Sequence, residues 1–541
     1  MKWMDWICQG IFGDELATET ERYVRELANA PIRASRKNAT DLLQRLAAGP
    51  GPKIRLGTTT WGEPVIVPAR EILNAHGLVT GSTGSGKTRF ALVALHAVID
   101  QLPQNPKLGF GIIDPKGELY DGVLYLLMRR LEDLERTDHE AAKALRRRIH
   151  IIDFSARDPI TSYNILARWP GADADYFASV RTDLLLDLLR NGDQQVWGVA
   201  ALQKTIRLVS AFGLPMQYAT EILRNETLRR LLLARSKDDE VVSYFTRQFA
   251  EVPKATVPAI CRRLDALFSS DGVRLALSGN TAPDFRRLQD EGCIVLAKCF
   301  GLNISRRVRQ LLQNLTGCDV IQSVFSRRER DVTFQWVFDE AQNFLVSRVL
   351  YELLVDLVTM GRSFGTHALF ETQDVETAVP DTRMLKTLYT NIRWACALRG
   401  EPSDNQFLRA AIPVTGRREQ PQTNPFREKT FYSLTEERAI LLNDIAKLPD
   451  RSGYLWLKAH GADAINIRTA DLPLPPDQEL QASTRALRND PTFGHRVSRK
   501  EHLHLIAERD REWLTEPAGA AGGASADLEK EYRRRKGKDE Q

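Results

Sequence analysis

One short stretch constrains the fold of this chain more than any other, because it matches the phosphate-binding pattern G-x-x-x-x-G-K-[ST] at every fixed position. It consists of eight consecutive residues: Gly81, Ser82, Thr83, Gly84, Ser85, Gly86, Lys87 and Thr88. Glycine adopts backbone angles closed to other residues, so the N–H groups of such a loop can turn inward and surround phosphate oxygens. We expect Lys87 to contact the β- and γ-phosphates and the Thr88 hydroxyl to ligate Mg²⁺. The stretch therefore predicts binding of ATP and Mg²⁺.

The residues around this loop agree with the prediction. Residues 76–80 are typical of a short strand entering the loop, and residues 90–99 of an apolar helix leaving it. The N-terminus of that helix would bring the positive end of its dipole to the phosphates. The alternative interpretation is a surface turn rich in glycine and serine.

A second signal is an apolar strand at residues 332–338 that ends in Asp339 and Glu340. ATP hydrolysis needs a carboxylate to hold the Mg²⁺ shell and a second group to orient the attacking water. We predict that Asp339 holds Mg²⁺, partly through a bound water, and that Glu340 polarises the nucleophilic water.

Three further polar residues close the predicted strand at 108–113, namely Asp114, Lys116 and Glu118. The carboxyl ends of parallel strands form the ligand-binding edge of an open α/β sheet, so these residues are candidates for cofactor binding. The alternative is a turn built by the Asp-Pro and Lys-Gly pairs.

Two more candidates flank the predicted strand at 367–371. Gln373 follows it, and its amide could sense the γ-phosphate or the water; a capping amide is the alternative. Arg362 precedes it and reads as a surface arginine, unless the chain forms a ring in which this arginine reaches the neighbour's γ-phosphate.

The order of elements predicts the fold class. Strands and helices alternate from about residue 53 to 171 and again from 285 to 475, which is the pattern of an α/β protein with one large, mostly parallel sheet. From 172 to 284 apolar residues recur at spacings of three and four, which predicts an all-helical insertion. Residues 1–52 are predicted to be helical, and 476–541 to be a largely flexible extension.

Composition limits the choice of partner and compartment. The formal net charge is only +5, so any charge that binds DNA must be local. The six cysteines form no C-x-x-C pair and several lie in apolar runs, which favours buried thiols in a reducing compartment. No secretory signal and no apolar stretch near the ~18 residues of a membrane span is visible. We expect a cytoplasmic chain, at most peripheral at the inner membrane.

The two ends of the chain leave alternatives open. Residues 3–12 form an apolar cluster that could anchor the chain at a membrane interface or pack as a helix on the body or on a neighbouring subunit. The basic residues 533–536 lie in the predicted tail, and contact with nucleic acid or with a partner is one interpretation of them.

Taken together, these motifs resemble the type IV coupling proteins (TraD/TraG-like), within the HerA–FtsK class of ring-forming DNA-translocating ATPases. The resemblance covers roughly residues 53–475 and depends on the order and spacing of several motifs. They are His76, Gly81 to Thr88, Asp114 to Glu118, Tyr163 to Leu166, Asp339 to Gln342, Gly361 to Gly365 and Gln373.

The resemblance implies a RecA-like P-loop domain interrupted by an all-α domain that faces the relaxosome and entering DNA. It also implies that Lys87 and Thr88, then Asp339 and Glu340, are the two ATPase motifs. Gln373 takes the sensor position, and Arg362 acts in trans within a homo-hexamer. Relaxase or another secretion substrate, DNA and the type IV secretion channel would be partners. Typical members carry an N-terminal transmembrane region, which this sequence does not show. A separate membrane subunit or a different role would account for that difference. In addition, Ile165 stands where typical members usually have proline.

Three functions remain open at this point. The first is a hexameric DNA translocase of a conjugative or type IV secretion system. The second is an ATP-gated docking platform that recruits relaxase or effectors to a secretion channel. The third is a HerA-like translocase that serves a partner nuclease in defence or repair.

Overall fold

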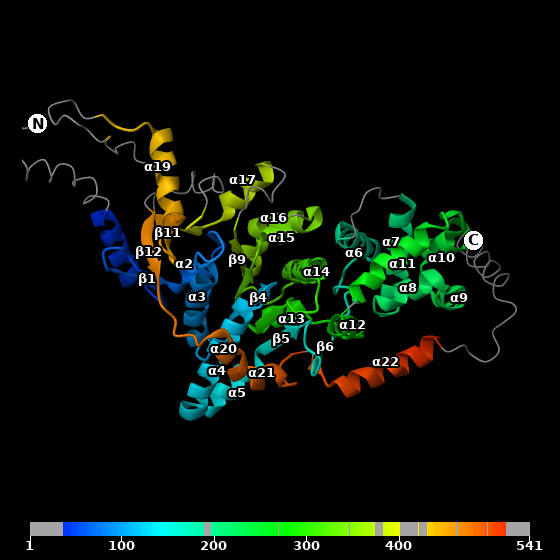
Figure 1. The fold of residues 1–541 in the computed structure, drawn as a ribbon. Helices are drawn as coiled ribbons and strands as arrows, with labels where there is room; N and C mark the ends of the chain where they lie inside the picture. Colours follow the sequence, from blue (N-terminus) through cyan, green and yellow to red (C-terminus); the bar gives the residue numbers. More distant parts are fainter. Residues whose placement is uncertain are drawn as a thin grey trace, which may run out of the picture. The chain divides into compact units, whose positions relative to one another are not determined.

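The computed structural model describes most of the chain (Figure 1). The described residues are 36–188, 196–268, 270–345, 347–373, 382–400, 420, 430–460, 464–494 and 496–514. The apolar segment 3–12, Cys8 and the basic cluster 533–536 lie outside them. The described residues fall into two compact units, of which the first comprises residues 1–72, 77–94 and 393–472 and the second the remainder.

The first unit carries the predicted phosphate-binding loop and six strands in the order β2-β1-β12-β11-β10-β3. The strands are β1 (Lys53–Thr58), β2 (Pro64–Pro68), β3 (Gly77–Thr80), β10 (Trp394–Leu398), β11 (Ser452–Leu457) and β12 (Ile465–Thr469). Only β10 and β3 are parallel, and the other neighbours are antiparallel. The helices are 36–48, α2 (Ala69–Leu73), α3 (Lys87–Gln101), α19 (Leu434–Ala446) and the single turn η5 (Lys458–His460).

The second unit contains a fully parallel sheet in the order β9-β8-β4-β7-β5. Its strands are β4 (Leu108–Asp114), β5 (Ile149–Asp153), β7 (Ile294–Lys298), β8 (Thr333–Phe338) and β9 (Thr366–Thr372). Strands β4, β7 and β9 are buried along their whole length, as expected for parallel strands covered on both faces. The helices between them are α4 (Glu118–Thr137), α5 (His139–Arg147), α13 (Phe285–Asp290), α14 (Arg306–Val324), α15 (Gln342–Leu345), α16 (Arg348–Met360), η4 (Gly361–Phe364) and α17 (Thr382–Asn391).

The predicted all-helical insertion is confirmed in the part of residues 172–284 that the structure describes. Its helical elements are α6 (Ala174–Leu188), α7 (Val196–Ala211), α8 (Gln217–Arg224), α9 (Glu226–Arg235), α10 (Asp239–Ser243), η1 (Tyr244–Gln248), η2 (Phe249–Glu251), α11 (Thr256–Asp265), η3 (Ala266–Phe268) and α12 (Asp271–Leu277). Together with the parallel sheet, they confirm the predicted α/β class. The antiparallel pairing of β10 with β11 and of β11 with β12 differs from the expected mostly parallel pattern. For β11 and β12 the reason is the short connection between them, which permits only a hairpin.

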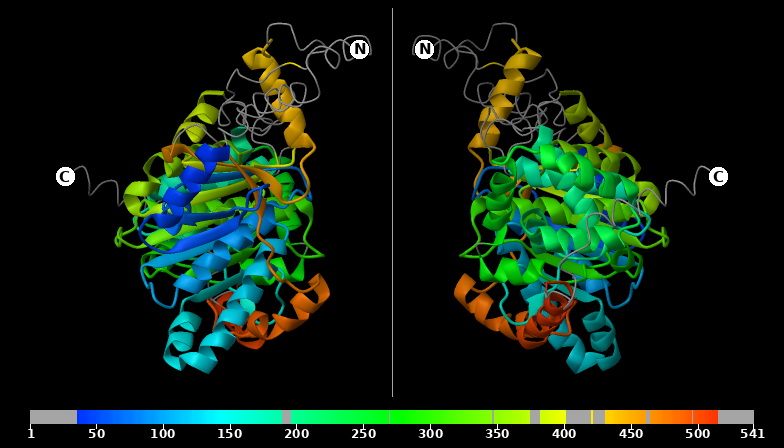
Figure 2. Two further views of the ribbon diagram at one scale, coloured as in Figure 1. Left: turned by 90° about the vertical axis from the view of Figure 1, so that its left-hand side faces the viewer. Right: turned by 90° about the vertical axis from the view of Figure 1, so that its right-hand side faces the viewer.

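Ordered structure also continues beyond Pro475, where the sequence suggested little of it. The additional elements are α20 (Asp477–Ser483), α21 (Arg485–Asn489), β13 (Arg496–Val497) and α22 (Arg499–Leu514), with β13 paired to β6 (Ile160–Thr161). Helix α20 packs beside α4, as the ribbon views show (Figures 1 and 2). Arg488 of α21 pairs with Asp121 of α4 at 2.8 Å. The order arises from contacts with distant segments, which local composition does not reveal.

The described cysteines agree with the expectation of buried thiols. Cys261, Cys293, Cys299, Cys318 and Cys396 are all buried and free. Burial raises the pKa of the Cys318 thiol to about 12, so it behaves as a small apolar side chain. Among the described residues, no helix is long and apolar enough to cross a membrane.

Candidate functional site

The predicted phosphate-binding loop joins β3 to α3, which begins at Lys87. Gly86 has a φ of 104°, and a Cβ atom there would lie 2.8 Å from Arg451 Cγ. Both the backbone conformation and the close packing therefore require glycine. The Lys87 ammonium donates to the carbonyl oxygens of Gly81 at 2.7 Å and Ser82 at 3.1 Å. The Lys87 ammonium therefore points back at the carbonyl oxygens of the loop, and a bound phosphate would compete with these oxygens for it.

Two neighbouring segments of the first unit hold this loop in shape. The Ser82 N–H and Oγ donate to the Arg399 carbonyl at 2.7 and 3.2 Å, just after β10. The Arg451 N–H, just before β11, donates to the Ser85 carbonyl at 2.8 Å. Thr88 is half-buried in the first turn of α3. The loop conformation is therefore set by β10 and β11 as well as by its own glycines.

The second unit holds the acidic residues, at the carboxyl end of β8. Asp339 and Glu340 directly follow the strand and are 4% and 6% exposed. The Asp339 N–H donates to the Ile113 carbonyl at 3.2 Å, and its carbonyl accepts from Gln313 Nε2 at 2.9 Å. Glu340 has a φ of 51°, which is rare outside glycine and common at functional sites.

Three polar side chains converge on the Glu340 carboxylate. Lys116 Nζ forms an ion pair with Oε1, and Gln342 Nε2 donates to Oε2. Gln373 Nε2 lies 3.3 and 3.4 Å from the two oxygens. Gln342 is itself held by Thr372, whose hydroxyl donates to it at 2.9 Å. The structure thus brings Lys116, Glu340 and Gln373 together, as three of the residues that the sequence singled out.

The two acidic residues have opposite electrostatic settings. Burial and the carboxylates of Asp114 and Glu371 raise the pKa of Asp339 well above its usual value. Burial would also raise the pKa of Glu340, but the hydrogen bond and charge of Lys116 hold it below the usual value. Glu340 is therefore ionised at neutral pH. Oxygen ligands in an excess of negative charge suit a hard divalent cation such as Mg²⁺, so the Asp339 environment fits that ion.

Asp114 has a structural task at the end of β4. Its carboxylate accepts the N–H groups of Lys116 at 2.7 Å, Gly117 at 2.7 Å and Tyr120 at 2.8 Å. These bonds close the turn and satisfy free N–H groups at the start of α4. This geometry matches the turn interpretation for Asp114, while Lys116 projects to Glu340. Glu118 is exposed in the first turn of α4.

Arg362 lies at the opposite end of its strand from this cluster. It is exposed in η4, just before the amino end of β9, whereas Gln373 follows the carboxyl end. A strand of 7 residues spans about 20 Å, so Arg362 and Glu340 of the same chain are far apart within the second unit. An arginine at this end cannot serve the acidic cluster of its own chain.

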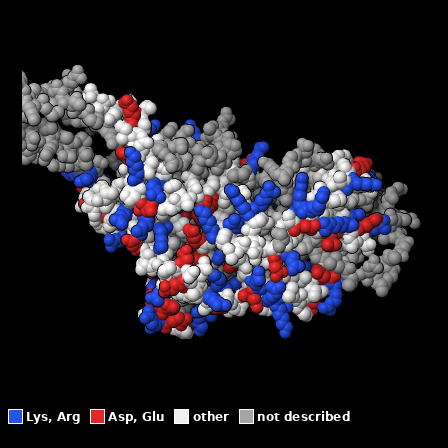
Figure 3. Space-filling view, in the orientation of Figure 1, with Lys and Arg blue, Asp and Glu red and all other residues white. Residues whose placement is uncertain are grey.

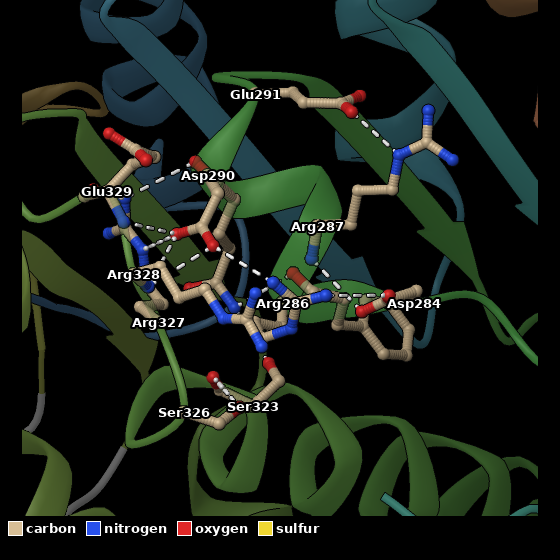
Figure 4. A network of polar contacts seen from close by, with 12 residues as sticks. Asp284, Arg286, Arg287, Asp290, Glu291, Ser323, Ser326, Arg327, Arg328 and Glu329 are labelled. Carbon is tan, nitrogen blue, oxygen red and sulfur yellow. Dashed lines mark hydrogen bonds and ion pairs between the residues drawn. The ribbon is translucent and has the colours of Figure 1, made fainter. Parts of the chain in front are cut away.

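The turn that carries Arg362 is firmly anchored. Gly365 has a φ of 69°, and a Cβ atom there would lie 2.5 Å from the Arg330 carbonyl oxygen. Arg327, fully buried, donates to the Thr366 hydroxyl at 2.8 Å and to Asp290 at 3.2 Å. Figure 4 shows Asp290 accepting from several residues around this arginine. The exposed Arg362 therefore extends from a rigid support.

Sequence reasoning assigned no role to three residues around the acidic cluster. Gln342 lies two positions after Glu340, so its proximity was readable from the sequence. Glu371 is a charged residue inside an apolar strand, which is also a visible signal. Gln313 gave no signal, because it lies mid-helix in α14 and reaches Asp339 only through the fold. Among the described residues, no group of three or more His, Cys, Asp or Glu is arranged to hold a metal by itself.

Comparison with known proteins finds similarity in structure but not in sequence. No protein-family model matches the sequence, and no curated protein is similar to it in sequence. The phosphate-binding loop, the parallel sheet and the helical insertion together define a RecA-like P-loop fold.

Solved structures of the conjugative coupling protein TrwB share this fold. The unbound monoclinic form of TrwBΔN70 matches 84% of this chain and 94% of its own, with a TM-score of 0.53 and 15% sequence identity. TrwB in complex with ADP and Mg²⁺ matches 81% of this chain and 94% of its own, with a TM-score of 0.53 and 15% identity. The expected resemblance to coupling proteins is thus confirmed at the level of the fold.

Proposed function

We propose that this chain is an ATP-hydrolysing DNA translocase that resembles the coupling proteins of conjugative and type IV secretion systems. The observation that carries the proposal is the ionised Glu340, held by Lys116, Gln342 and Gln373 directly after Asp339 at the end of β8. A base that orients water needs this combination of a negative charge and fixed geometry.

The residues divide the work as follows. The loop residues Gly81 to Thr88 bind the phosphates through backbone N–H groups, and Lys87 exchanges its loop carbonyl partners for the β- and γ-phosphates. Thr88 and Asp339 would hold Mg²⁺, partly through water, and the ion would offset charge on the phosphates. Glu340 accepts a proton from the attacking water while Gln373 keeps the water and the base in register.

Arg362 acts on the nucleotide of a neighbouring subunit in this proposal. Its distance from the acidic cluster of its own chain supports a role in trans, and its anchored turn supports a fixed presentation. Each site then needs two chains, as in a ring, and we propose a homo-hexamer. Hydrolysis would depend on assembly.

DNA is the proposed substrate, with relaxase and type IV secretion channel components as partners. A separate membrane subunit would be a further partner. The runner-up is an ATP-gated docking platform in which the helical insertion reads a protein. The formal charges of residues 172–284 cancel, which favours that alternative. A HerA-like motor that serves a partner nuclease differs from the main proposal in its partner alone.

The test is the ATPase rate of wild type and Lys87→Ala with no DNA, with single-stranded DNA and with duplex DNA. We expect stimulation by DNA that the substitution abolishes. A rate that Lys87→Ala leaves intact would refute the ATPase assignment. A Lys87-dependent rate that neither DNA changes would refute translocation and favour the docking platform, to be tested with protein partners of residues 172–284.

A further inference from the structure

An exposed loop in the second unit carries basic and apolar side chains without partners. The loop connects β7 to α14, and Leu302 at its tip is 96% exposed. Arg306 and Arg307 follow in the first turn of α14 and are also exposed. A single exposed leucine is common on protein surfaces. Beside arginines that have no ion pair, however, it forms a surface that suits a partner with both negative charge and apolar area.

The neighbouring loop after β5 adds to this surface. A Cβ atom at Gly301 would lie 2.8 Å from Ser155 Cβ, so the two loops are in contact. Arg157, two residues beyond Ser155, is exposed as well. We define the β7-edge patch as Arg157, Leu302, Arg306 and Arg307.

No carboxylate pairs with any of the three arginines of the patch among the described residues. Within the described part of the chain, none of their three side chains has an ion pair or a hydrogen bond. By contrast, Arg274 and Arg287, also exposed, each pair with a carboxylate at 2.6 Å. Basic and acidic side chains are interspersed over the face drawn in Figure 3, in keeping with a net charge of only +5. A local excess of unpaired positive charge is therefore notable.

The position of these arginines is unfavourable for the free chain. The first turn of α14 contains no acidic residue. The N-terminus of a helix carries a partial positive charge, so cations there are repelled and anions are attracted. The patch thus carries unbalanced charge that an external anion would neutralise.

We propose that the β7-edge patch binds the phosphate backbone of nucleic acid, with Leu302 against the sugars or bases. Exposed arginines without protein partners release counter-ions when they bind phosphates, and this release supplies affinity that does not depend on sequence. The inference rests on the proposed function and assigns the residues that hold its substrate.

Helix α14 connects this patch to the acidic cluster. Gln313 lies seven positions after Arg306, which is about two helical turns or ~10 Å further on the same side. Its Nε2 donates to the Asp339 carbonyl at 2.9 Å, and its Oε1 accepts from Asn343 at 3.1 Å. A shift of α14 on binding nucleic acid would therefore act directly on the Asp339–Glu340 segment.

The experiment uses the full chain and a fluorescein-labelled oligonucleotide, single-stranded and duplex, at several salt concentrations. The variant is Arg306→Gln with Arg307→Gln. The matched control is Arg129→Gln with Arg136→Gln, two exposed arginines of α4 that have carboxylate partners. We expect the magnitude of the slope of log affinity against log salt to fall by about 1.4–1.8 in the variant, since each of the two lost phosphate contacts contributes about 0.7–0.9. The control should keep the wild-type slope.

A second variant, Gln313→Met, separates binding from coupling. It should keep the wild-type affinity and salt slope but reduce the ratio of DNA-stimulated to basal ATPase. An unchanged slope in the Arg306/Arg307 variant, with DNA still bound and ATP still hydrolysed, would overturn the patch and leave the proposed function standing. A wild-type chain that hydrolyses ATP but binds neither oligonucleotide would overturn both the patch and the DNA substrate.

Discussion

Lys116 Nζ forms an ion pair with Glu340 Oε1, which joins the carboxyl end of β4 to that of β8. The Glu340 side chain is 7% exposed and that of Lys116 is 42% exposed, so a solvent-accessible cation holds a buried carboxylate. Residues 114–118 therefore contribute to the proposed catalytic base and not only to cofactor binding.

Removal of Lys116 should impair hydrolysis more than ATP binding. Lys116→Met leaves the Glu340 carboxylate buried without its cation, so we expect kcat to fall roughly tenfold or more, equivalent to about 1.4 kcal/mol. Lys116→Arg keeps the charge and should retain more activity. Steady-state ATPase kinetics and the affinity for a labelled ATP analogue measure the two effects. A Lys116→Met chain with normal kcat would contradict the role of this ion pair.

Arg362 and Lys87 should complement each other between chains. Arg362→Ala alone should lower kcat by about 10³-fold or more, as loss of an arginine finger does, and Lys87→Ala alone should be inactive. In a mixed ring, a chain with intact Lys87 can receive Arg362 from its neighbour. At equal amounts, about a quarter of the interfaces are complete, so we expect about a quarter of the wild-type rate.

The measurement is the ATPase rate of the mixture after subunit exchange. Arg348→Ala, at an exposed arginine of α16 paired with Glu352, is the matched control and should be active alone. A mixture that is no more active than its components would argue against action in trans.

Gly111 should not tolerate a side chain while Trp336 is present. The two residues are paired between β4 and β8, and a Cβ atom at Gly111 would lie 2.2 Å from the indole ring. We expect Gly111→Ala to destabilise the fold by about 1–3 kcal/mol through overpacking. Adding Trp336→Phe should cost less than the sum of the two single changes, because the smaller ring makes room.

Thermal unfolding followed by circular dichroism measures these changes. The control is Gly198→Ala, where the nearest atom is 3.5 Å from the new methyl group. Gly198 lies in a helix, so alanine should be neutral or stabilising by about 0.4–1 kcal/mol. Additive effects at Gly111 and Trp336 would contradict the steric account.

His367 should make the fold sensitive to mild acid. Burial, with the charges of Arg362 and Arg327, lowers the pKa of His367 to about 4 from its ordinary value of 6.5. Between these values the unfolded chain binds a proton that the folded chain does not, so stability falls as the pH falls from about 6.5 towards 4. The loss at pH 5 is about 2 kcal/mol.

The difference in melting temperature between pH 7 and pH 5 tests this prediction. It should be smaller in His367→Gln than in wild type, whatever the change in absolute stability. His139→Gln, at an exposed histidine, is the control and should keep the wild-type difference. An equal pH dependence in all three chains would rule out His367 as its source.

Local patterns predicted most strands and helices of the second unit, because each apolar run is short, buried and followed by polar residues. The segment 332–338, for example, became β8 (Thr333–Phe338) with Asp339 and Glu340 at its end. Strand polarity was equally informative, since it placed Arg362 and Gln373 at opposite ends of β9.

Contacts between distant segments were beyond sequence reasoning. The pairing of Lys116 with Glu340, and of Gln313 with Asp339, depends on which strands are neighbours. The same limit applies to the helices after Pro475, since α22 is held by contacts such as Tyr218 with Asp510 at 2.8 Å. No local pattern records such partners.

The turn closed by Asp114 has a consequence for the timescale of events at Glu340. Because Asp114 holds three backbone N–H groups, those of Lys116, Gly117 and Tyr120, the backbone at this corner cannot move without breaking them together. Lys116 can therefore change partner only by rotating its four-carbon side chain. Rotations of this kind in exposed side chains take picoseconds to nanoseconds, whereas loop movements take much longer. Release of Glu340 by Lys116 thus requires a rotation of the lysine side chain and no movement of the backbone at this corner.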